Sequence, residues 1–338
     1  MLKLRRGTVV EAGETGEPMQ RLEVDVAGER RAALADLALV GPSEAGDDVV
    51  VNTEARDLAL GSGGFDVVHV NLTRGCAGEG VPGAHVMKLN YTSLQHAVLP
   101  VEEEQLAVPL GRPAAVVGLH GQLAPLAWAL AEAAPGTRLG YVQTAGGALP
   151  GGLSGVVREL RRRGLLAGHL TAGPAFGGEG EAITAAGAIQ HGLAGLGWDA
   201  AVCGPGPGIL GSGSALGHGG MVAMDTAHAA LALGCPTLVV ARMSGGDPRP
   251  RHRGVSHHSR TVFELLLAPV TVALPEGFDG EVPARHDVRR VPADLAGYRA
   301  SGLPASTMGR ALEEDPAFFA AALAAGTVLA GLTAEWGA

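Results

Sequence analysis

Lysine is nearly absent from this chain, because only Lys3 and Lys88 occur among its 25 basic residues. The 34 acidic residues leave a formal net charge of -9 at pH 7. Nucleic-acid binders carry a basic face, so this charge argues against nucleic acid as a partner. The arginines nevertheless gather locally, at 161–163 and at Arg249, Arg251 and Arg253. A site for a small anionic ligand is therefore compatible with the overall charge.

Cysteine is also scarce. Cys76, Cys203 and Cys235 are odd in number and scattered, which excludes a disulfide framework and a Cys-x-x-Cys zinc site. The first residues, MLKLRRGTVVEAG, carry positive charges with no apolar run behind them, so they do not form a secretory signal. Together these features predict a reducing, cytoplasmic location.

No long apolar run that could cross a membrane stands out. The stretches 113–131 and 200–224 are interrupted by polar residues and glycines. Residues 316–334 come closest, but they consist mostly of alanine and glycine, which favour membrane insertion only weakly. We therefore predict a buried or amphipathic helix over 316–328 and no membrane partner.

Aromatic residues make up only 4% of the chain and charged residues 17%, whereas 46% are hydrophobic. The 53 glycines and 21 prolines follow no three-residue period, so the chain is neither collagen-like nor of low complexity. They lie between blocks of Val, Leu and Ala that have the lengths of strands and helices. With 338 residues, the chain is predicted to be a globular protein of two domains.

The first hundred residues predict short β-strands separated by glycine-rich turns. Helical periodicity is nearly absent there, and strands are expected at 7–11, 19–26, 30–37, 48–51, 65–72 and 85–91. Closing into a small antiparallel barrel is how such strands remove their exposed edges. We predict a small β-barrel domain over residues 1–105, with a linker within 100–113.

Apolar runs alternate with helix-length segments from Ala114 onward. Strands are expected at 114–119, 138–143, 168–172, 199–203, 237–241 and 270–274, with helices at about 122–134, 153–164, 180–196, 216–233 and 258–267. This alternation predicts a doubly wound, mostly parallel, Rossmann-like α/β sheet domain over residues 112–338. A C-terminal tail with helices around 307–313 and 316–325 completes that domain.

Glycine-rich or polar loops follow each expected strand of this sheet, which predicts one functional edge. After the fourth strand, residues 204–220 read GPGPGILGSGSALGHGG, in which glycines and two hydroxyls open a helix. Amides at a helix start favour anions, so we predict an anion-binding loop of Gly206, Gly208, Gly211, Ser212, Gly213 and Ser214. The alternative is a tight connection stiffened by proline. A dinucleotide fingerprint is not supported, because the next strand ends in Arg242 rather than in an acidic residue.

The loop after the fifth strand is the most polar stretch of the chain. Arginine donates two parallel hydrogen bonds to phosphate or carboxylate, so an anion would contact Arg242, Arg251 and Arg253. The same loop supplies candidate catalytic residues and candidate ligands of a divalent metal ion, namely His252, His257, His258 and Asp247. Three interpretations are open: metal ligands, acid–base or anion contacts without metal, and a surface loop or subunit contact.

Four further residues are secondary candidates for the site. His120 and Thr144 follow the first and second strands directly, and a structural hydrogen bond explains each equally well. Glu179 and Glu181 lie at the start of the expected third helix. A carboxylate there either caps the helix or reaches into the site.

A resemblance spans nearly the whole chain. It is carried by GDDVVVNTEARDLALGSGG, HVMKLNYTSLQ, TAGPAFGGEGEA, GPGPGILGSGSALGHGG, DPRPRHRGVSHHS, STMGR and EEDPAFF. Together these segments resemble a bacterial family known only as domain of unknown function 3866. The resemblance implies a bacterial, cytoplasmic protein and brings no reaction, substrate or catalytic residue with it.

The leading hypothesis is an enzyme that acts by hydrolysis or group transfer on a small phosphorylated or otherwise anionic substrate. A serine hydrolase is not expected, because Ser154 lacks the Gly-x-Ser-x-Gly spacing. The competing hypothesis is a non-catalytic nucleotide-sensing or scaffold protein, and a third is an NAD(P)-dependent oxidoreductase. The charge-poor composition also predicts self-association, for which a homodimer is the commonest form.

Overall fold

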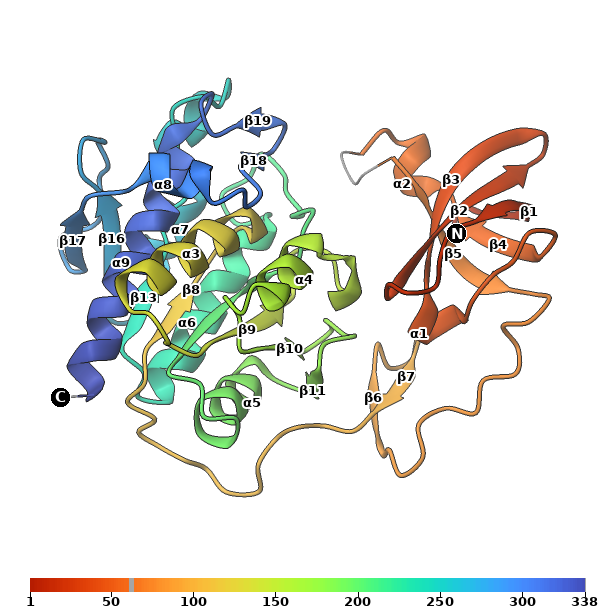
Figure 1. The fold of residues 1–338 in the computed structure, drawn as a ribbon, viewed down its shortest axis with the longest axis horizontal. Helices are drawn as coiled ribbons and strands as arrows, with labels where there is room; N and C mark the ends of the chain where they lie inside the picture. Colours follow the sequence, from red (N-terminus) through yellow and green to blue (C-terminus); the bar gives the residue numbers. More distant parts are fainter. Residues whose placement is uncertain (61–63, 338) are drawn as a thin grey trace. The chain divides into compact units, whose positions relative to one another are not determined.

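The structure is a computed structural model that describes residues 1–60 and 64–337 (Figure 1). Contacts between residues divide the chain into two units, Met1–Leu99 and Pro100–Ala338. Each unit has an apolar core of its own.

The first unit contains a closed barrel with the strand order β1-β2-β3-β5-β4. Its strands are β1 (Leu4–Ala12), β2 (Met19–Val26), β3 (Glu29–Asp36), β4 (Asp48–Asn52) and β5 (Asp66–Asn71). Alternate side chains point inward, and Val24, Val49 and Val51 are fully buried in the barrel core. The sequence predicts a wholly antiparallel barrel, but β3 and β5 run parallel, because β4 intervenes in the chain and pairs with β1 and β5.

Short elements complete the first unit: α1 (Leu37–Val40), α2 (Glu54–Asp57), β6 (Val86–Lys88) and β7 (His96–Val98). β6 and β7 form a hairpin separate from the barrel sheet. β6 is shorter than the expected strand 85–91. Leu89 and Tyr91 have φ values of 49° and 60°, a left-handed conformation that cannot continue a strand.

The second unit is built on an eight-stranded parallel sheet in the order β11-β10-β9-β12-β8-β13-β16-β17. Its strands are β8 (Ala114–Val116), β9 (Leu139–Thr144), β10 (Gly168–Ala172), β11 (Gly180–Ala182), β12 (Ala200–Pro205), β13 (Thr237–Val239), β16 (Thr271–Pro275) and β17 (Asp287–Val291). The six expected strands form its centre, and β11 and β17 are edge strands that the sequence analysis did not predict.

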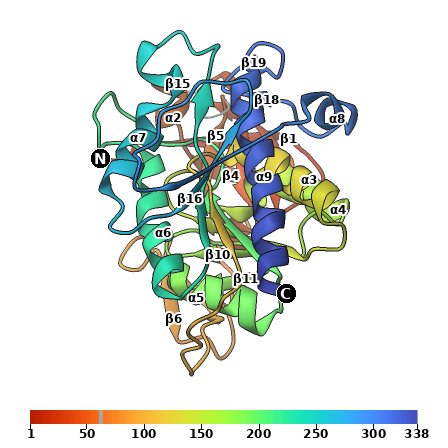
Figure 2. The same ribbon diagram turned by 90° about the vertical axis from the view of Figure 1, so that its left-hand side faces the viewer.

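Helices cover both faces of this sheet (Figure 2). One face carries α3 (Leu123–Ala133), α4 (Gly155–Arg162), α8 (Leu295–Ala300) and α9 (Pro316–Gly337). The other carries α5 (Ala185–Gln190) with its π-helical continuation (His191–Gly195), α6 (Val222–Ala232) and α7 (His257–Leu265). Neighbouring strand residues such as Ala114 and Ala115 belong to opposite cores, so the central strands are apolar throughout.

The third expected helix begins later than predicted. Residues 180–182 form β11, which pairs with β10, for example Gly180 with Leu170. α5 begins at Ala185, because the Oγ1 of Thr184 accepts a hydrogen bond from the N–H of Gly187 and caps the helix.

The C-terminal tail also differs from its prediction. The sequence predicts a helix over 307–313, but this region forms a hairpin of β18 (Ser306–Thr307) and β19 (Arg310–Ala311). Met308 and Gly309 have φ values of 49° and 74°, and this left-handed turn excludes a helix.

α9 is longer than the expected helix 316–325. The segment Pro316–Trp336 is long and apolar enough to cross a membrane, yet 78% of its most apolar window is buried inside the structure. Phe318, Phe319 and Leu323 are fully buried in the core shared with α3. A core helix meets the same criteria of length and hydropathy, and this position accounts for the composition of α9.

Residues 100–113, where a linker was expected, run along the second unit. The N–H of Val101 donates to the carbonyl of Glu181, and that of Leu110 donates to the carbonyl of Leu233. The segment leads directly into the central strand β8.

Candidate functional site

A hairpin after β13 positions the polar loop. Its strands β14 (Met243–Ser244) and β15 (Gly254–Val255) pair antiparallel and return the chain to the start of α7. The N–H of Arg242 donates to the Oγ of Ser259 at 2.8 Å, and the carbonyl of Arg242 accepts from the N–H of Ser256 at 2.8 Å. These bonds hold the start of α7 beside the carboxyl end of β13.

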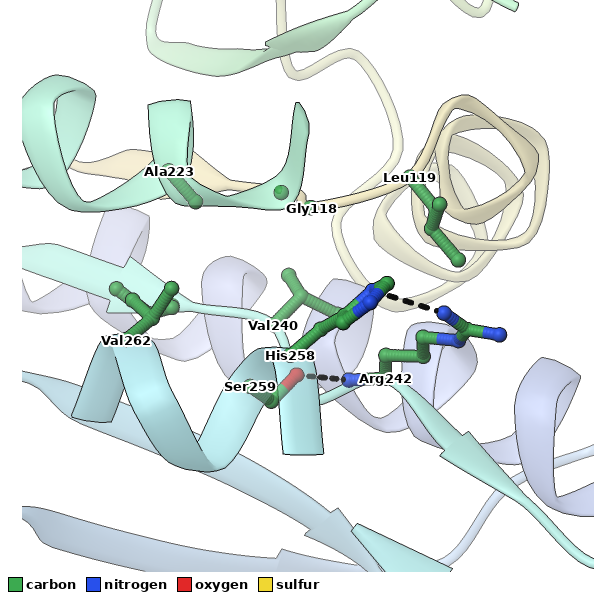
Figure 3. Close-up of a pocket in the computed structure, with 10 residues that line it drawn as sticks. Gly118, Leu119, Ala223, Val240, Arg242, His258, Ser259 and Val262 are labelled. Carbon is green, nitrogen blue, oxygen red and sulfur yellow. Dashed lines mark hydrogen bonds between the residues drawn. The ribbon is translucent and has the colours of Figure 1, made fainter. Parts of the chain in front are cut away.

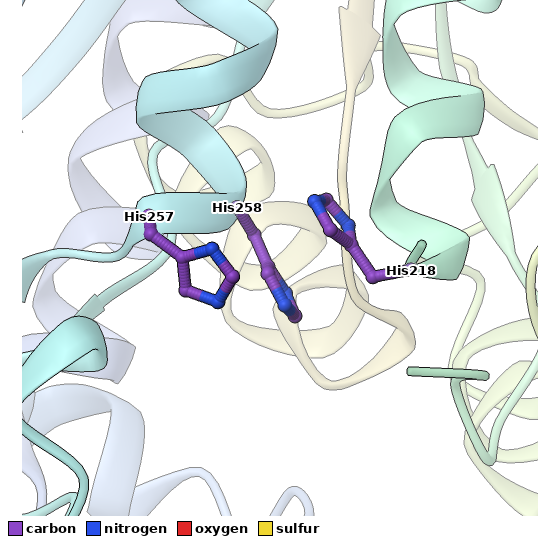
Figure 4. A group of neighbouring side chains, drawn as sticks. All are labelled: His218, His257 and His258. Carbon is purple, nitrogen blue, oxygen red and sulfur yellow. The ribbon is translucent and has the colours of Figure 1, made fainter. Parts of the chain in front are cut away.

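Four imidazole rings meet at this point: His218, His252, His257 and His258. The rings of His218 and His258 stack with their centroids 3.7 Å apart. The centroid of His257 lies 4.3 Å from that of His258 and 4.9 Å from that of His252. His258 lies between His257 and His218, and His218 comes from the loop before α6 (Figure 4). Ligand atoms of these three lie within 4.8 Å of one another.

Hydrogen bonds use only part of these rings. The Nε2 of His218 lies 3.0 Å from the carbonyl oxygen of Ala215, and the Nδ1 of His258 accepts from the Nη1 of Arg242 at 2.9 Å. Across residues 1–60 and 64–337, the Nδ1 of His218 and the Nε2 of His257 are buried without a hydrogen-bond partner. Buried polar atoms are normally paired, so these two nitrogens mark a place that a ligand can complete.

The histidines are neutral at neutral pH. Burial lowers the pKa of His252 to about 4 and that of His258 to about 2, and the positive charge of Arg242 contributes to both shifts. The pKa values of His218 and His257 are also lowered, mainly by burial. A neutral imidazole can accept a proton or bind a metal ion.

A narrow pocket lies beside the rings, at the carboxyl ends of β8 and β13 (Figure 3). Its lining includes Gly118 and Leu119 after β8, and Arg242 and His258 form its polar wall. Residues at the starts of α6 and α7 complete it, so two helix N-termini contribute partial positive charge. The pocket has room for about one water molecule.

Arg242 is a buried guanidinium with an unused donor. Its side chain is 4% exposed, and burial lowers its pKa to about 10. Besides His258, its donors face the Sδ of Met308 at 3.2 Å and the Oδ2 of Asp247 at 3.5 Å. Its Nε is buried with no hydrogen-bond partner among the described residues. A buried donor without a partner is costly, and a bound anion would supply that partner.

Asp247 is not a free carboxylate. The Nε and Nη2 of Arg249 occupy its two oxygens at 2.9 and 2.8 Å, and these bonds hold the pKa of Asp247 well below its usual range. The Nη2 of Arg310 lies 3.5 Å from the Oδ2 of Asp247 and is buried without a hydrogen-bond partner in the described chain. The structure therefore places Asp247 in an arginine network and not among the histidines.

Asp315, which the sequence analysis did not select, is the second carboxylate of this network. It accepts hydrogen bonds from two backbone N–H groups, from the Oγ of Ser244 at 2.6 Å and from the Nε of Arg310 at 3.0 Å. The two carboxylates face three arginines, Arg242, Arg249 and Arg310. Three positive charges against two negative ones leave one positive charge in excess beside the pocket.

The expected anion-binding loop uses its hydroxyls internally. The Oγ of Ser212 donates to the carbonyl of Gly217 at 2.8 Å, and the Oγ of Ser214 accepts from the N–H of Gly217 at 2.8 Å. The loop does not open the helix directly, because a 3₁₀ turn (Gly219–Met221) precedes α6. Anion binding through these two hydroxyls stays a prediction that requires the loop to rearrange.

The backbone of this loop explains several of its glycines without a ligand. Gly206 packs against the carbonyl of Ala148, and Gly208 has a φ of 70°. Gly211 forms an isolated bridge with His218. A Cβ added at Gly213 would lie 4.0 Å from the Nη1 of Arg251, so the loop tip lies next to the short turn that carries His252.

Arg251 and Arg253 are exposed on either side of His252. The Nε of Arg253 donates to the carbonyl of Asp247 at 3.3 Å, which ties its side chain to the loop. The charge of Arg251 contributes to the lowered pKa of His257. The structure thus brings both arginines to the rim of the histidine cluster.

His120 makes a buried pair with Ser154. The Nε2 of His120 lies 2.7 Å from the Oγ of Ser154, and its Nδ1 lies 3.1 Å from the carbonyl oxygen of Pro205. This is the spacing of a nucleophile and its base. Ser154 is only 2% exposed, however, and its Oγ caps α4 by accepting from the N–H of Val157. The geometry is that of a structural pair.

The remaining secondary candidates contact their neighbours. The Oγ1 of Thr144 donates to the carbonyl of Ala145 at 3.3 Å, and Glu179 accepts from the Nε of Arg161 at 2.7 Å. Glu181 lies in β11 and accepts from the N–H of Gly177 at 2.6 Å. Neither glutamate caps a helix here.

His218 is the site histidine that the sequence analysis missed. It stands between Gly217 and Gly219, inside the stretch interpreted as an anion-binding loop. The sequence signal that could have identified His218 is its position at the end of the glycine-rich loop, at the predicted functional edge of the sheet. Its contact with His258 depends on the packing of α6 beside α7, which local sequence patterns do not show.

Comparisons with known proteins identify a family without a known activity. A sequence search finds no match among curated proteins. A crystal structure of YjeQ from Thermotoga maritima is similar at 14% identity, over 65% of this chain and 64% of that chain, with a TM-score of 0.14. The family model described as Protein of unknown function (DUF3866) matches residues 32–326, a range that includes the whole pocket and all four histidines. The chain therefore belongs to the family DUF3866.

Proposed function

We propose that the protein is an enzyme that acts by hydrolysis or group transfer on a small phosphorylated or otherwise anionic substrate. The anionic group would bind at the carboxyl ends of β8 and β13, as ligands do in Rossmann-like parallel sheets. The observation that carries this proposal is the buried guanidinium of Arg242, whose Nε has no hydrogen-bond partner in the described residues.

Two unpaired donors and two helix N-termini lie near the place where the anion would bind. The Nε of Arg242 and the Nη2 of Arg310 are buried donors without hydrogen-bond partners within the described part of the chain. The N-termini of α6 and α7 add partial positive charge. Because the pocket has room for about one water molecule, an anion enters only after the contact between Arg242 and His258 opens.

His257 supplies the acid–base group of the proposed reaction. Its ring is half-buried, and its Nε2 carries no hydrogen bond to the protein. In hydrolysis of a phosphate ester, a water oxygen bonds to phosphorus while the ester P–O bond breaks. Neutral His257 takes the proton from that water, and the protonated ring then gives it to the leaving oxygen.

The proposal is tested by following phosphorus-containing products with 31P NMR. The purified protein is incubated with pyrophosphate, sugar phosphates and nucleotides, with and without added divalent metal. We expect turnover of one class, and a loss of about 10²–10⁴-fold in the His257→Ala variant. His228→Ala, on α6 away from the pocket lining, is the matched control and should keep full activity.

Two results would count against an enzyme. Binding of a phosphate compound without any product would favour the non-catalytic sensing protein. Equal turnover by the His257→Ala variant and the wild type, with unchanged circular dichroism, would remove His257 from the reaction.

A further inference from the structure

His218 has the tautomer and the burial of a metal ligand. Its side chain is 6% exposed, and its Nε2 lies 3.0 Å from the carbonyl oxygen of Ala215. A carbonyl only accepts hydrogen bonds, so the Nε2 carries the hydrogen and the Nδ1 carries a lone pair. That Nδ1 is buried without a hydrogen-bond partner among residues 1–60 and 64–337. A ring held by a carbonyl on one side and free on the other is typical of metal-binding histidines.

His257 and His258 bring two more imidazoles to the same place. The Nε2 of His257 is buried and lacks a hydrogen-bond partner in the described residues. The ring of His258 lies between His218 and His257, with centroid distances of 3.7 and 4.3 Å. One nitrogen of each ring lies within 4.8 Å of the others.

The donors described above attract an anion, whereas these lone pairs attract a cation. We propose that His218, His257 and His258 bind one divalent transition metal ion, for which Zn²⁺ is the natural probe because imidazole ligands suit it. Metal binding by these three rings does not depend on the proposed function. The use of the metal to polarise a phosphoryl oxygen or an attacking water rests on the proposed function. In the metal-bound protein this activation replaces proton transfer to the Nε2 of His257, because one nitrogen cannot both bind the metal and accept a proton.

Other nearby residues are already engaged. The Nδ1 of His252 lies 2.8 Å from the Oγ of Ser256, and both oxygens of Asp247 are held by Arg249. The metal set therefore differs from the one predicted from the sequence. His218 replaces His252 and Asp247, and the two histidines at the start of α7 are retained.

Metal binding requires local movement. Two nitrogens at 2.0–2.1 Å from one tetrahedral zinc ion lie about 3.4 Å apart, so the rings must draw together. The rings of His218 and His258 must also tilt apart from their stacked arrangement, because a lone pair lies in the plane of its ring and two parallel rings cannot point at one ion. Arg242 donates to the Nδ1 of His258 and its charge opposes a cation, so its guanidinium must leave that ring. An anion bound to Arg242 would neutralise this charge. We therefore expect zinc and phosphate to strengthen each other's binding by the same factor.

The test is equilibrium zinc binding to the full, metal-stripped chain, measured by competition with a chromophoric chelator. We expect one Zn²⁺ per chain in the wild type and at least about tenfold weaker binding in His218→Gln and His257→Gln. His228→Gln is the control and should bind like the wild type. Cobalt substituted for zinc should give the visible absorption of a tetrahedral site, and this absorption should be lost in the two variants.

The proposal is overturned if the wild type binds no zinc, or if both variants bind it as tightly as the wild type while their thermal unfolding is unchanged. Weaker zinc binding by His228→Gln would place the metal elsewhere and overturn it as well. Phosphate binding in the presence of excess chelator tests the proposed function separately, because Arg242 and Arg310 need no metal to bind an anion.

Discussion

His120 and His169 show how burial governs the charge of single residues in the second unit. Burial lowers the pKa of each to about 4, and for His169 the nearby His120 adds to the effect. The Nε2 of His169 lies 3.1 Å from the Oε1 of Gln143, and its ring stacks on Tyr141 with centroids 5.2 Å apart. Both imidazoles are therefore packed as neutral groups.

These two histidines predict a loss of stability in mild acid. In the unfolded chain a histidine has a pKa near 6.5, so between pH 6.5 and 4 the unfolded state binds more protons and stability falls as the pH falls. From pH 7 to pH 5, each buried histidine should cost about 2 kcal/mol of unfolding free energy. Urea denaturation at the two pH values measures this.

His169→Gln separates the contribution of one ring. Glutamine keeps a donor for the Oε1 of Gln143 but does not titrate, so the stability difference between pH 7 and pH 5 should shrink by about 2 kcal/mol. An unchanged difference would show that His169 binds its proton as readily in the folded protein as in the unfolded chain.

For single residues, the sequence predicted which polar side chains belong to the candidate site better than it predicted which residues they contact. The loop 242–259 was predicted to be functional from its polar density, and His257 and His258 do lie together at the carboxyl edge of the sheet. Asp247 was grouped with them, but Arg249, two residues away, holds its carboxylate. Asp315 and His218 could not be found, because their contacts join segments far apart in the chain.

Among the secondary-structure elements, α9 gives the sharpest test of packing. Gly326 faces α3, where an added Cβ would lie 2.8 Å from the Cβ of Ala129 and closer still to the carbonyl of Leu126. Gly331, five residues further along the same helix, is exposed, and nothing lies within 4 Å of its added Cβ. The two glycines therefore lie in the same helix, but Gly326 packs against α3 and Gly331 is exposed.

Alanine substitutions at these glycines should have opposite effects. Gly326→Ala forces α9 away from α3 and should destabilise the protein by about 1–3 kcal/mol. Gly331→Ala should stabilise it by up to about 1 kcal/mol, because alanine favours the helix and loses less backbone entropy on folding. Thermal unfolding of both variants measures these effects. A lower Tm for Gly331→Ala than for Gly326→Ala would contradict the close packing of Gly326 against α3.

The elements of the fold were predictable where their patterns were long and apolar. Six central strands and most helices follow from apolar runs and their spacing. β11 and β17 are short or charged edge strands, and residues such as Glu181 and Arg289 conceal them. The turn at Met308 and Gly309 was missed because its left-handed backbone depends on local geometry and not on apolar periodicity.

At the scale of the whole molecule, the barrel and the α/β unit have separate cores. Leu22 is 4% exposed within the barrel core, and the pocket residues all belong to the second unit. Leu22→Ala should destabilise the barrel by about 2–5 kcal/mol and leave the site unchanged. Calorimetry should show a lowered transition for the barrel alone, with zinc and phosphate binding at wild-type affinity. A single transition that shifts as a whole would contradict independent units.

Calorimetric titration of the metal-free protein with inorganic phosphate measures whether the carboxyl edge of the sheet binds an anion through Arg242. We predict one phosphate per chain for the wild type and at least about tenfold weaker binding for Arg242→Gln, because a charge-assisted hydrogen bond is lost. Arg162→Gln, which removes an exposed arginine from α4, is the control and should bind like the wild type. Equal phosphate affinity of Arg242→Gln and the wild type, or no phosphate binding by the wild type, would show that Arg242 does not hold an anion at this edge.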